Sequence, residues 1–275
     1  MSRNKNRVAA NVPHVQQVPQ MEPEMVQATS PFNFIVPTEM IDIPSKGEYY
    51  PEGHPLCGVD SIEIKHLTAK EEDILTSQSL IKKGLAINKV LESIIVDKRI
   101  SVDDLLIGDK NALVVASRIY GYGSDYNVNL SCPSCEAQFQ ATVDLHEFKP
   151  KEIELSDKIE KTENNTFVIT LPKSEFVLEF RLLTSKDEAM ITKESKKGTT
   201  SLLKLIIVSI NGQTDRFYID RALQALPILD ASVLKRVYAS VMPDVDMSCE
   251  VECTSCGEES EMEVPLTAEF FWPNL

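Results

Sequence analysis

The chain has 275 residues, a formal net charge of −14 and 43% hydrophobic residues. This length and composition are those of an ordinary globular protein with one large domain or two smaller ones. Nucleic-acid binders gain most of their affinity when Lys and Arg neutralise phosphates, so the acidic charge argues against nucleic acid and anionic membranes as partners. No apolar run approaches the about 20 residues that a membrane-spanning helix needs. The N-terminus also lacks the apolar stretch of a secretory signal, so we expect a cytosolic protein with reduced thiols.

Residues 1–35 are rich in Gln, Pro, Asn, Val and Met and show neither a helical nor a strand period. Such a segment cannot bury a core of its own, and we expect a flexible N-terminal arm. Two interpretations stay open: a tail without a role, or a segment that becomes ordered on a partner surface.

The folded part is expected to begin near Phe34. The Pro- and Gly-rich run at 43–51 predicts extended segments and turns, and the alternation at 62–64 predicts a strand. Thr68 and Glu71 are spaced as a capping box, in which each residue binds the backbone N–H of the other at a helix N-terminus.

Further elements follow along the chain. The apolar periodicity predicts helices at 86–96 and 111–119, and strands at 126–130 and 139–143. The run at 202–210 is apolar except for Lys204 and is expected to be a buried helix. The C-terminal aromatic residues Phe270, Phe271 and Trp272 are expected to pack against the protein's own core; the alternative is that they anchor a partner.

The second half of the chain repeats the order of the first. The segment 62–71 resembles 178–187, with the same alternation, the same Leu-Thr pair and an acidic residue three positions after the Thr. Three shorter matches follow in the same order, 94–96 with 206–208, 118–120 with 236–238, and 132–135 with 253–256. The shifts are 116, 112, 118 and 121 residues, which is the pattern that loop insertions produce in a duplicated unit. We therefore predict two copies of one unit, 36–150 and 151–275; the alternative is a coincidence of common α+β patterns.

Two Cys-x-x-Cys pairs are the clearest chemical feature of the sequence. Two intervening residues allow one tight turn to direct both thiolates at a single ion, and tetrahedral zinc needs a second pair to complete its ligands. Each predicted copy provides one pair at an equivalent position. We predict one structural zinc ion whose ligands are Cys132, Cys135, Cys253 and Cys256.

Several alternatives remain for these cysteines. The site could have lost its metal, or the pairs could form disulfides under oxidation. Redox chemistry of the thioredoxin type is disfavoured because the pairs lie between strands and beside Glu136, Glu258 and Glu259 rather than at a helix N-terminus. Cys249 could replace one ligand and His146 could contact the metal, whereas Cys57 is expected to be a small buried apolar group.

No motif for catalysis is present. The sequence lacks Gly-x-Ser-x-Gly, a phosphate-binding loop and His-Glu-x-x-His, and Gly121-Tyr122-Gly123 lacks the third glycine of a dinucleotide fingerprint. We therefore expect a structural or assembly protein rather than an enzyme. A hydrolase would need a pocket with carboxylates of shifted pKa.

Four tracts resemble the T4-type bacteriophage baseplate hub and hub-assembly proteins. They are 43–51, 67–76, 104–112, and 118–123 followed by the first cysteine pair. The resemblance extends over roughly residues 40–275 and implies a role in building the baseplate of a contractile tail, by binding other tail proteins and without catalysis. It implies a location in the host cytoplasm during assembly or in the tail baseplate of the virion. The alternative function is a zinc-ribbon adaptor of cellular transcription or translation machinery, which a basic face would favour.

Overall fold

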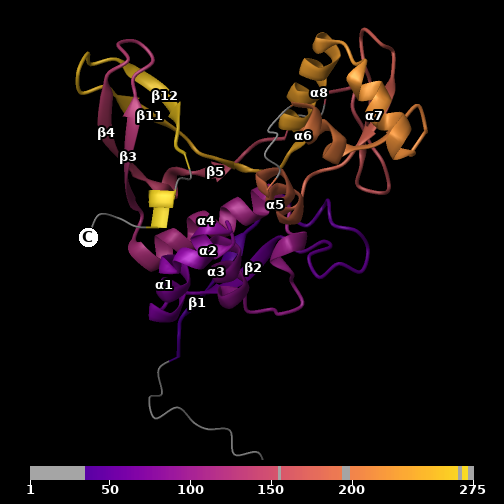
Figure 1. Cartoon of the computed structure of the whole chain (residues 1–275). Coiled ribbons are helices and arrows are strands. Elements are labelled where there is room, and N and C mark those ends of the chain that lie inside the picture. Colours follow the sequence, from indigo (N-terminus) through magenta and orange to yellow (C-terminus); the bar gives the residue numbers. More distant parts are fainter. Residues whose placement is uncertain (1–34, 154–155, 194–198, 266–267, 272–275) are drawn as a thin grey trace, which may run out of the picture. The chain divides into compact units, whose positions relative to one another are not determined.

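Strands and helices alternate along both halves of the chain in the computed structural model, which describes residues 35–153, 156–193, 199–265 and 268–271 (Figure 1). This confirms the predicted mixed α+β class. Residues Val36–Leu275 form one compact unit. The expected N-terminal arm lies outside the described residues except for its last position, and it stays a prediction.

The first half of the chain contains the following elements: β1 (Thr38–Asp42), β2 (Ser61–Lys65), α1 (Ala69–Thr76), α2 (Gln78–Lys82), α3 (Ala86–Ile94), the 3-10 helix η1 (Val102–Asp104), α4 (Ile107–Tyr122), β3 (Asp125–Ser131), β4 (Gln138–Asp144), η2 (Leu145–Glu147) and β5 (Lys149–Pro150). The second half contains β6 (Glu160–Lys161), β7 (Phe167–Thr170), β8 (Val177–Phe180), α5 (Ser185–Lys193), α6 (Thr199–Ile206), β9 (Ile207–Ile210), α7 (Arg216–Gln224), α8 (Ile228–Val241), β10 (Val245–Asp246), β11 (Ser248–Glu252), β12 (Glu259–Glu263) and η3 (Ala268–Phe271).

One predicted element is wrong over part of its length. The run at 202–210 is not a single helix, because α6 ends at Ile206 and the chain continues as strand β9. The residues of β9 are Ile-Val-Ser-Ile, and β-branched side chains favour a strand wherever a neighbouring strand is available. Here β8 provides that neighbour. Tertiary pairing, which the apolar pattern alone does not reveal, decides the conformation.

Strands β1 and β2 and the extended segment at Ile95 lie side by side in the first half. Strands β1 and β2 pair antiparallel with Ile41 opposite Ile62, and Ile95 forms a bridge with Ile64 on the other side of β2. Helix α1 begins with the predicted capping box, which the structure confirms. The Glu71 carboxylate accepts hydrogen bonds from the backbone N–H and the hydroxyl of Thr68.

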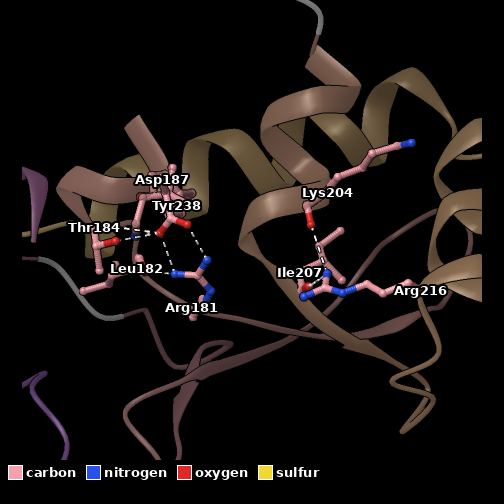
Figure 2. Close-up of polar contacts among 9 residues, drawn as sticks. Arg181, Leu182, Thr184, Asp187, Lys204, Ile207, Arg216 and Tyr238 are labelled. Atoms are coloured by element: carbon pink, nitrogen blue, oxygen red, sulfur yellow. Dashed lines mark hydrogen bonds and ion pairs between the residues drawn. The ribbon is translucent and has the colours of Figure 1, made fainter. Parts of the chain in front are cut away.

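The second half begins in a similar way. In the sheet β6-β7-β8-β9, Ile169 lies opposite Leu178 and Phe180 lies opposite Ile207. At the start of α5, the Asp187 carboxylate accepts from the backbone N–H and the hydroxyl of Thr184 at 2.9 and 3.0 Å (Figure 2).

An arginine strengthens this second cap. Arg181 donates two hydrogen bonds to the two carboxylate oxygens of Asp187, at 2.7 and 2.9 Å (Figure 2). Burial raises the pKa of Asp187, but these bonds outweigh that effect and the pKa lies below its ordinary value. Arg216 donates to the carbonyl oxygens of Lys204 and Ile207 and thereby holds the end of α6.

The third residue of each long helix is a fully buried aspartate. On α4, Asp109 accepts from the backbone N–H of Ser45 at 2.9 Å, from the Ser45 hydroxyl at 2.6 Å and from the Tyr50 hydroxyl at 2.7 Å. On α8, Asp230 accepts from the backbone N–H groups of Lys173 and Ser174 at 2.9 and 2.8 Å. Asp109 therefore fixes the turn after β1, and Asp230 fixes the turn after β7.

The N-termini of α4 and α5 meet where the two halves contact each other. Leu106 and Thr184 form an antiparallel bridge. The N–H of Ile107 donates to the Leu183 carbonyl at 3.2 Å, and the N–H of Ser185 donates to the Leu105 carbonyl at 2.8 Å. The first N–H of a helix has no partner inside the helix, so this contact satisfies one such group on each helix.

The segments that follow the two cysteine hairpins are exchanged between the halves. Strand β5 of the first half pairs with β10 of the second. In return, η3 of the second half packs on the first, where the Phe270 ring lies 5.0 Å from the Tyr126 ring. The buried Arg118 joins this contact by donating to the carbonyl oxygens of Phe270, Gly123 and Asp125. Phe270 and Phe271 are buried as expected, and Trp272 lies outside the described residues.

The two buried aspartates should respond to pH in opposite ways. Burial raises the pKa of Asp109, and nearby Asp244 adds to the effect, so the folded protein binds this proton more tightly than the unfolded chain does. Asp109 therefore lowers stability as pH rises from the unfolded pKa near about 4 through the raised folded pKa. We predict that the free energy of unfolding of the wild type falls relative to that of Asp109→Asn between about pH 4 and pH 7, measured by urea denaturation.

Asp230→Asn is the matched control for this measurement. Burial alone would raise the pKa of Asp230, but hydrogen bonds from Ser174 and Lys173 outweigh it and the pKa is lowered. Its contribution to stability is fully present above the unfolded pKa and is lost only as pH falls through the folded value. The difference between wild type and Asp230→Asn should stay constant from about pH 5 to pH 7; a parallel drift in both variants would contradict the assignment.

Arg118 should be sensitive even to a conservative change. Arg118→Lys keeps the charge but cannot reach three carbonyl groups with a planar fork, so buried acceptors lose their donors. We expect a loss of about 2–4 kcal/mol in unfolding free energy, measured by chemical denaturation. Arg236→Lys, at an exposed position of α8, should change it by less than about 0.5 kcal/mol.

Candidate metal centre

Two hairpins with the same loop geometry carry the cysteine pairs. In β3–β4, the N–H of Cys132 donates to the Ala137 carbonyl and the N–H of Glu136 donates back to the Cys132 carbonyl, both at 2.9 Å. In β11–β12, Cys253 donates to Glu258 at 2.9 Å, and Gly257 donates to Cys253 at 2.8 Å. The fifth residue of each loop has a positive φ, 58° at Glu136 and 72° at Gly257, which turns the chain back so that both thiols of a pair point the same way.

The structure brings all four predicted ligands together. The sulfur atoms of Cys132, Cys135, Cys253 and Cys256 all lie within 4.8 Å of one another. Cys132 Sγ is 3.7 Å from Cys256 Sγ, and Cys135 Sγ is 3.8 Å from Cys253 Sγ. A tetrahedral zinc ion with Zn–S bonds of about 2.3 Å separates its sulfur ligands by about 3.8 Å. All four cysteines are free thiols at these separations, which are much longer than an S–S bond of about 2.05 Å.

Burial of the four thiols follows a simple pattern. The first cysteine of each pair is buried, at 3% exposure for Cys132 and 2% for Cys253, whereas the second cysteine is exposed. The cluster therefore lies at the surface end of the hairpins, with its inner edge against the apolar core. A structural zinc site with four protein ligands and no open position suits this environment.

Thiol ionisation in the cluster favours a bound cation. Backbone N–H groups of Cys256 and Ser255 lower the pKa of Cys253 to about 7. The backbone N–H of Glu258 also lowers the pKa of Cys256, but the neighbouring cysteines outweigh it and raise the pKa to about 12. One thiolate thus suppresses ionisation of the next, and four thiolates need a cation to balance their charge.

Two other residues considered as ligands lie outside the cluster. Cys249 points its sulfur toward the Met262 carbonyl, at 3.7 Å, and His146 lies in η2. Cys57 was expected to be buried, and it is exposed instead because it lies in the turn-rich loop between β1 and β2. In the described part of the chain, the four paired cysteines form the group of His, Cys, Asp and Glu side chains that could hold a metal ion.

A ladder of glutamates lies on the second hairpin and was not among the features expected from the sequence. Glu250 lies directly opposite Glu261, and Glu252 lies directly opposite Glu259, all of them exposed. Like charges at opposed positions destabilise a hairpin. The first hairpin has mostly amides and hydroxyls at its exposed positions instead. The alternation of Glu with other residues at 250–252 and 259–263 was the available signal in the sequence.

The fold and the cluster define an α+β protein in which two hairpins distant in sequence converge on one four-thiol site. The family model for the T4 bacteriophage base plate protein matches residues 38–272. The chain belongs to this family, and it is therefore a phage baseplate protein. No curated protein and no solved structure matches it. Within the described residues, no helix has the length and apolar character needed to cross a membrane.

Metal analysis tests the centre directly. We predict close to one zinc ion per chain in the purified protein, measured by elemental analysis, because four thiolates complete the tetrahedral coordination. Cys132→Ser should abolish zinc binding, and a strong chelator should lower the melting temperature of the wild type by at least about 10 °C, because zinc binding is coupled to folding of the site.

Cys57→Ser and Cys249→Ser are matched controls, since each removes one thiol outside the cluster. Both variants should keep the full zinc content. A wild-type protein with no metal and four titratable thiols in the cluster would contradict the assignment.

Proposed function

We propose that this baseplate protein is a hub component or a hub-assembly factor of a contractile tail, and that it acts by binding other tail proteins. A structural zinc ion held by Cys132, Cys135, Cys253 and Cys256 would fix its binding surfaces. The observation that carries the proposal is the family match over residues 38–272, together with a thiol cluster that joins segments 118 residues apart. Closing so long a loop by a metal crosslink restricts the unfolded chain strongly.

The chain is best explained as two copies of one unit, at 36–150 and 151–275. Strand register supports this. The pair Ile41–Ile62 in β1–β2 corresponds to Ile169–Leu178 in β7–β8 with shifts of 128 and 116 residues. The smaller second shift means that the loop between the strands is 12 residues shorter in the second copy. In both copies a proline follows the first strand of the matched pair, Pro44 after β1 and Pro172 after β7.

The following elements correspond as well. The bridge between Ile64 and Ile95 corresponds to the pair Phe180–Ile207. The caps at Thr68 and Thr184 use a carboxylate three residues later in both copies. Such agreement in hydrogen bonding is more specific than a shared order of strands and helices.

The long helices α4 and α8 correspond with a shift of 121 residues instead of the shift of 118 predicted from the sequence. Asp109 and Asp230 are separated by 121 residues, the same shift as the cysteine pairs, and they fix the turns after the matched strands β1 and β7. The match of 118–120 with 236–238 fits less well, because Arg118 is buried and Arg236 is exposed. The shift of 121 therefore describes α4 and α8 better than the shift of 118.

A binding role rather than catalysis is part of the proposal. No small-molecule substrate and no nucleic acid is proposed as a partner, and assembly would take place in the host cytoplasm. The alternative of a zinc-ribbon adaptor of transcription or translation would need a basic face. The second hairpin presents Glu250, Glu252, Glu259 and Glu261 instead, and these residues suit a tail protein with a basic patch.

A phage complementation experiment tests this function. A phage that lacks the gene should form no complete baseplates by negative-stain electron microscopy, and the wild-type gene supplied in trans should restore them. We predict that removing the charges of the glutamate ladder lowers the titre of infectious phage at least about tenfold, because encounter with a basic partner slows. The variant carries Glu250→Gln, Glu252→Gln, Glu259→Gln and Glu261→Gln.

The control changes net charge by the same amount at exposed positions elsewhere on the chain, with Glu52→Gln, Asp60→Asn, Glu152→Gln and Glu163→Gln. It should support a titre close to that of the wild type. Complete baseplates on the phage without the gene would overturn the proposed function.

A further inference from the structure

The contact between the two halves uses two different surfaces. The first half contributes the segment that leads into α4, Leu105–Ile107, and the second half contributes the segment that leads into α5, Leu183–Ser185. Residues after α8 complete the second surface, since a side chain at Gly108 would collide with the Pro243 carbonyl. A contact between unlike surfaces is heterologous, so each half keeps one surface of the opposite kind unused.

Both unused surfaces are partly exposed. With the shift of 121 residues, the counterpart of Leu105–Ile107 is the segment Leu226–Ile228; we call it, with Leu229, the α8 surface. With the shift of 116, the counterpart of Leu183–Ser185 is the segment Leu67–Ala69; we call it, with Tyr120, the α1 surface. Leu67 packs along Gly121, which places this segment beside the end of α4.

Exposure of these residues differs sharply from that of their counterparts. Leu105 and Ser185 are fully buried in the internal contact, whereas their counterparts Leu226 and Ala69 are half-buried and exposed. On the α8 surface, Ile228 is 86% and Leu229 is 51% exposed, and on the α1 surface Tyr120 is 38% exposed. Exposed apolar side chains gathered at one place mark an interaction site more often than scattered ones do.

The backbone groups needed for the same bridge are also available. The internal bridge uses the first N–H of each helix and the carbonyl two residues earlier. At the unused surfaces these groups are the N–H of Ala69 and Ile228 and the carbonyls of Leu67 and Leu226. None of the hydrogen bonds found among the described residues uses them. Pro227 stands where Leu106 stands in the first half, and the bridge does not need the N–H that proline lacks.

Electrostatics permits the same approach of two helix N-termini. The positive ends of α4 and α5 face each other in the internal contact, and each carries a carboxylate in its first turn, Asp109 and Asp187. The unused ends carry Asp230 on α8 and Glu71 on α1. All four helix ends therefore carry an acidic side chain in the first turn.

We propose that this protein associates head to tail with itself, with the α8 surface of one molecule bound to the α1 surface of the next through the bridge that joins the two halves. The proposal rests on the duplicated architecture proposed above and names a second copy of the chain as the partner. A heterologous contact of this kind produces a closed ring or a filament, depending on the rotation between molecules. Both are assemblies suited to a baseplate.

Two variants separate the two surfaces. Ile228→Asp places a charge on the α8 surface at an exposed position. Ala69→Pro removes one N–H from the α1 surface at the first position of a helix, where proline is well tolerated, and Thr68 already has the extended conformation (φ −122°, ψ 174°) that precedes proline. Phe217→Asp is the control for non-specific association, because Phe217 is 71% exposed and lies outside both surfaces.

Sedimentation velocity of the zinc-loaded full chain, from about 1 to 200 µM, measures the result. The wild type and Phe217→Asp should form species larger than the monomer, while Ile228→Asp and Ala69→Pro should each associate at least about tenfold more weakly. An equimolar mixture of the two should form a dimer and nothing larger, because each variant keeps the one surface that the other lacks.

A wild type that stays monomeric throughout this range, or a mixture that forms no dimer, would overturn head-to-tail association. The zinc content and the phage complementation titre are read from the same preparations and the same variants. A monomeric wild type with one zinc per chain and full complementation would therefore leave the proposed function in place.

Discussion

Four thiols within 4.8 Å of one another are the constraint on which the rest of this structure depends. Ionised sulfurs at such distances repel one another, and a cation turns that repulsion into attraction to a common centre. The hairpins that carry the thiols lie at the ends of two helices, α4 and α8. Joining the two hairpins at the cluster therefore also fixes the positions of these helices relative to each other.

The exchange of segments beyond the hairpins strengthens this arrangement. Strand β5 leaves the first half to pair with β10, and η3 leaves the second half to pack on Tyr126 and Arg118. Each half therefore lacks part of its packing when the other is absent. Arg118 illustrates the consequence, because its guanidinium is buried and each of its three carbonyl partners is close to the exchanged segment or within it.

The two contacts between the halves differ in kind. At the cluster the contacts are reciprocal, since the first cysteine of each pair lies closest to the second cysteine of the other. At α4 and α5 the contact joins unlike surfaces. A reciprocal contact closes on itself, whereas an unlike one leaves a free surface on each side. In the proposed duplicated architecture, the reciprocal contact would serve stability and the unlike contact would leave surfaces for the proposed self-association.

Much of this protein was determined by local sequence. The Thr68–Glu71 cap follows from residues three apart, the strands around each cysteine pair follow from their alternation, and the placing of two thiols on one turn follows from the spacing Cys-x-x-Cys. Each of these depends on contacts between near neighbours, which a sequence records directly. The repeated order of segments also predicted that the two distant cysteine pairs meet.

Only the tertiary structure decided the remaining features. Residues 207–210 form a strand because β8 lies beside them. Cys57 is exposed because the loop between β1 and β2 lies at the surface around it. The burial of Asp109, the exchange of β5 and η3, and the bridge between Leu106 and Thr184 all join residues far apart in the chain. Local patterns do not encode such contacts, because the free energy that selects them comes from long-range packing and pairing that arise only when the whole chain folds.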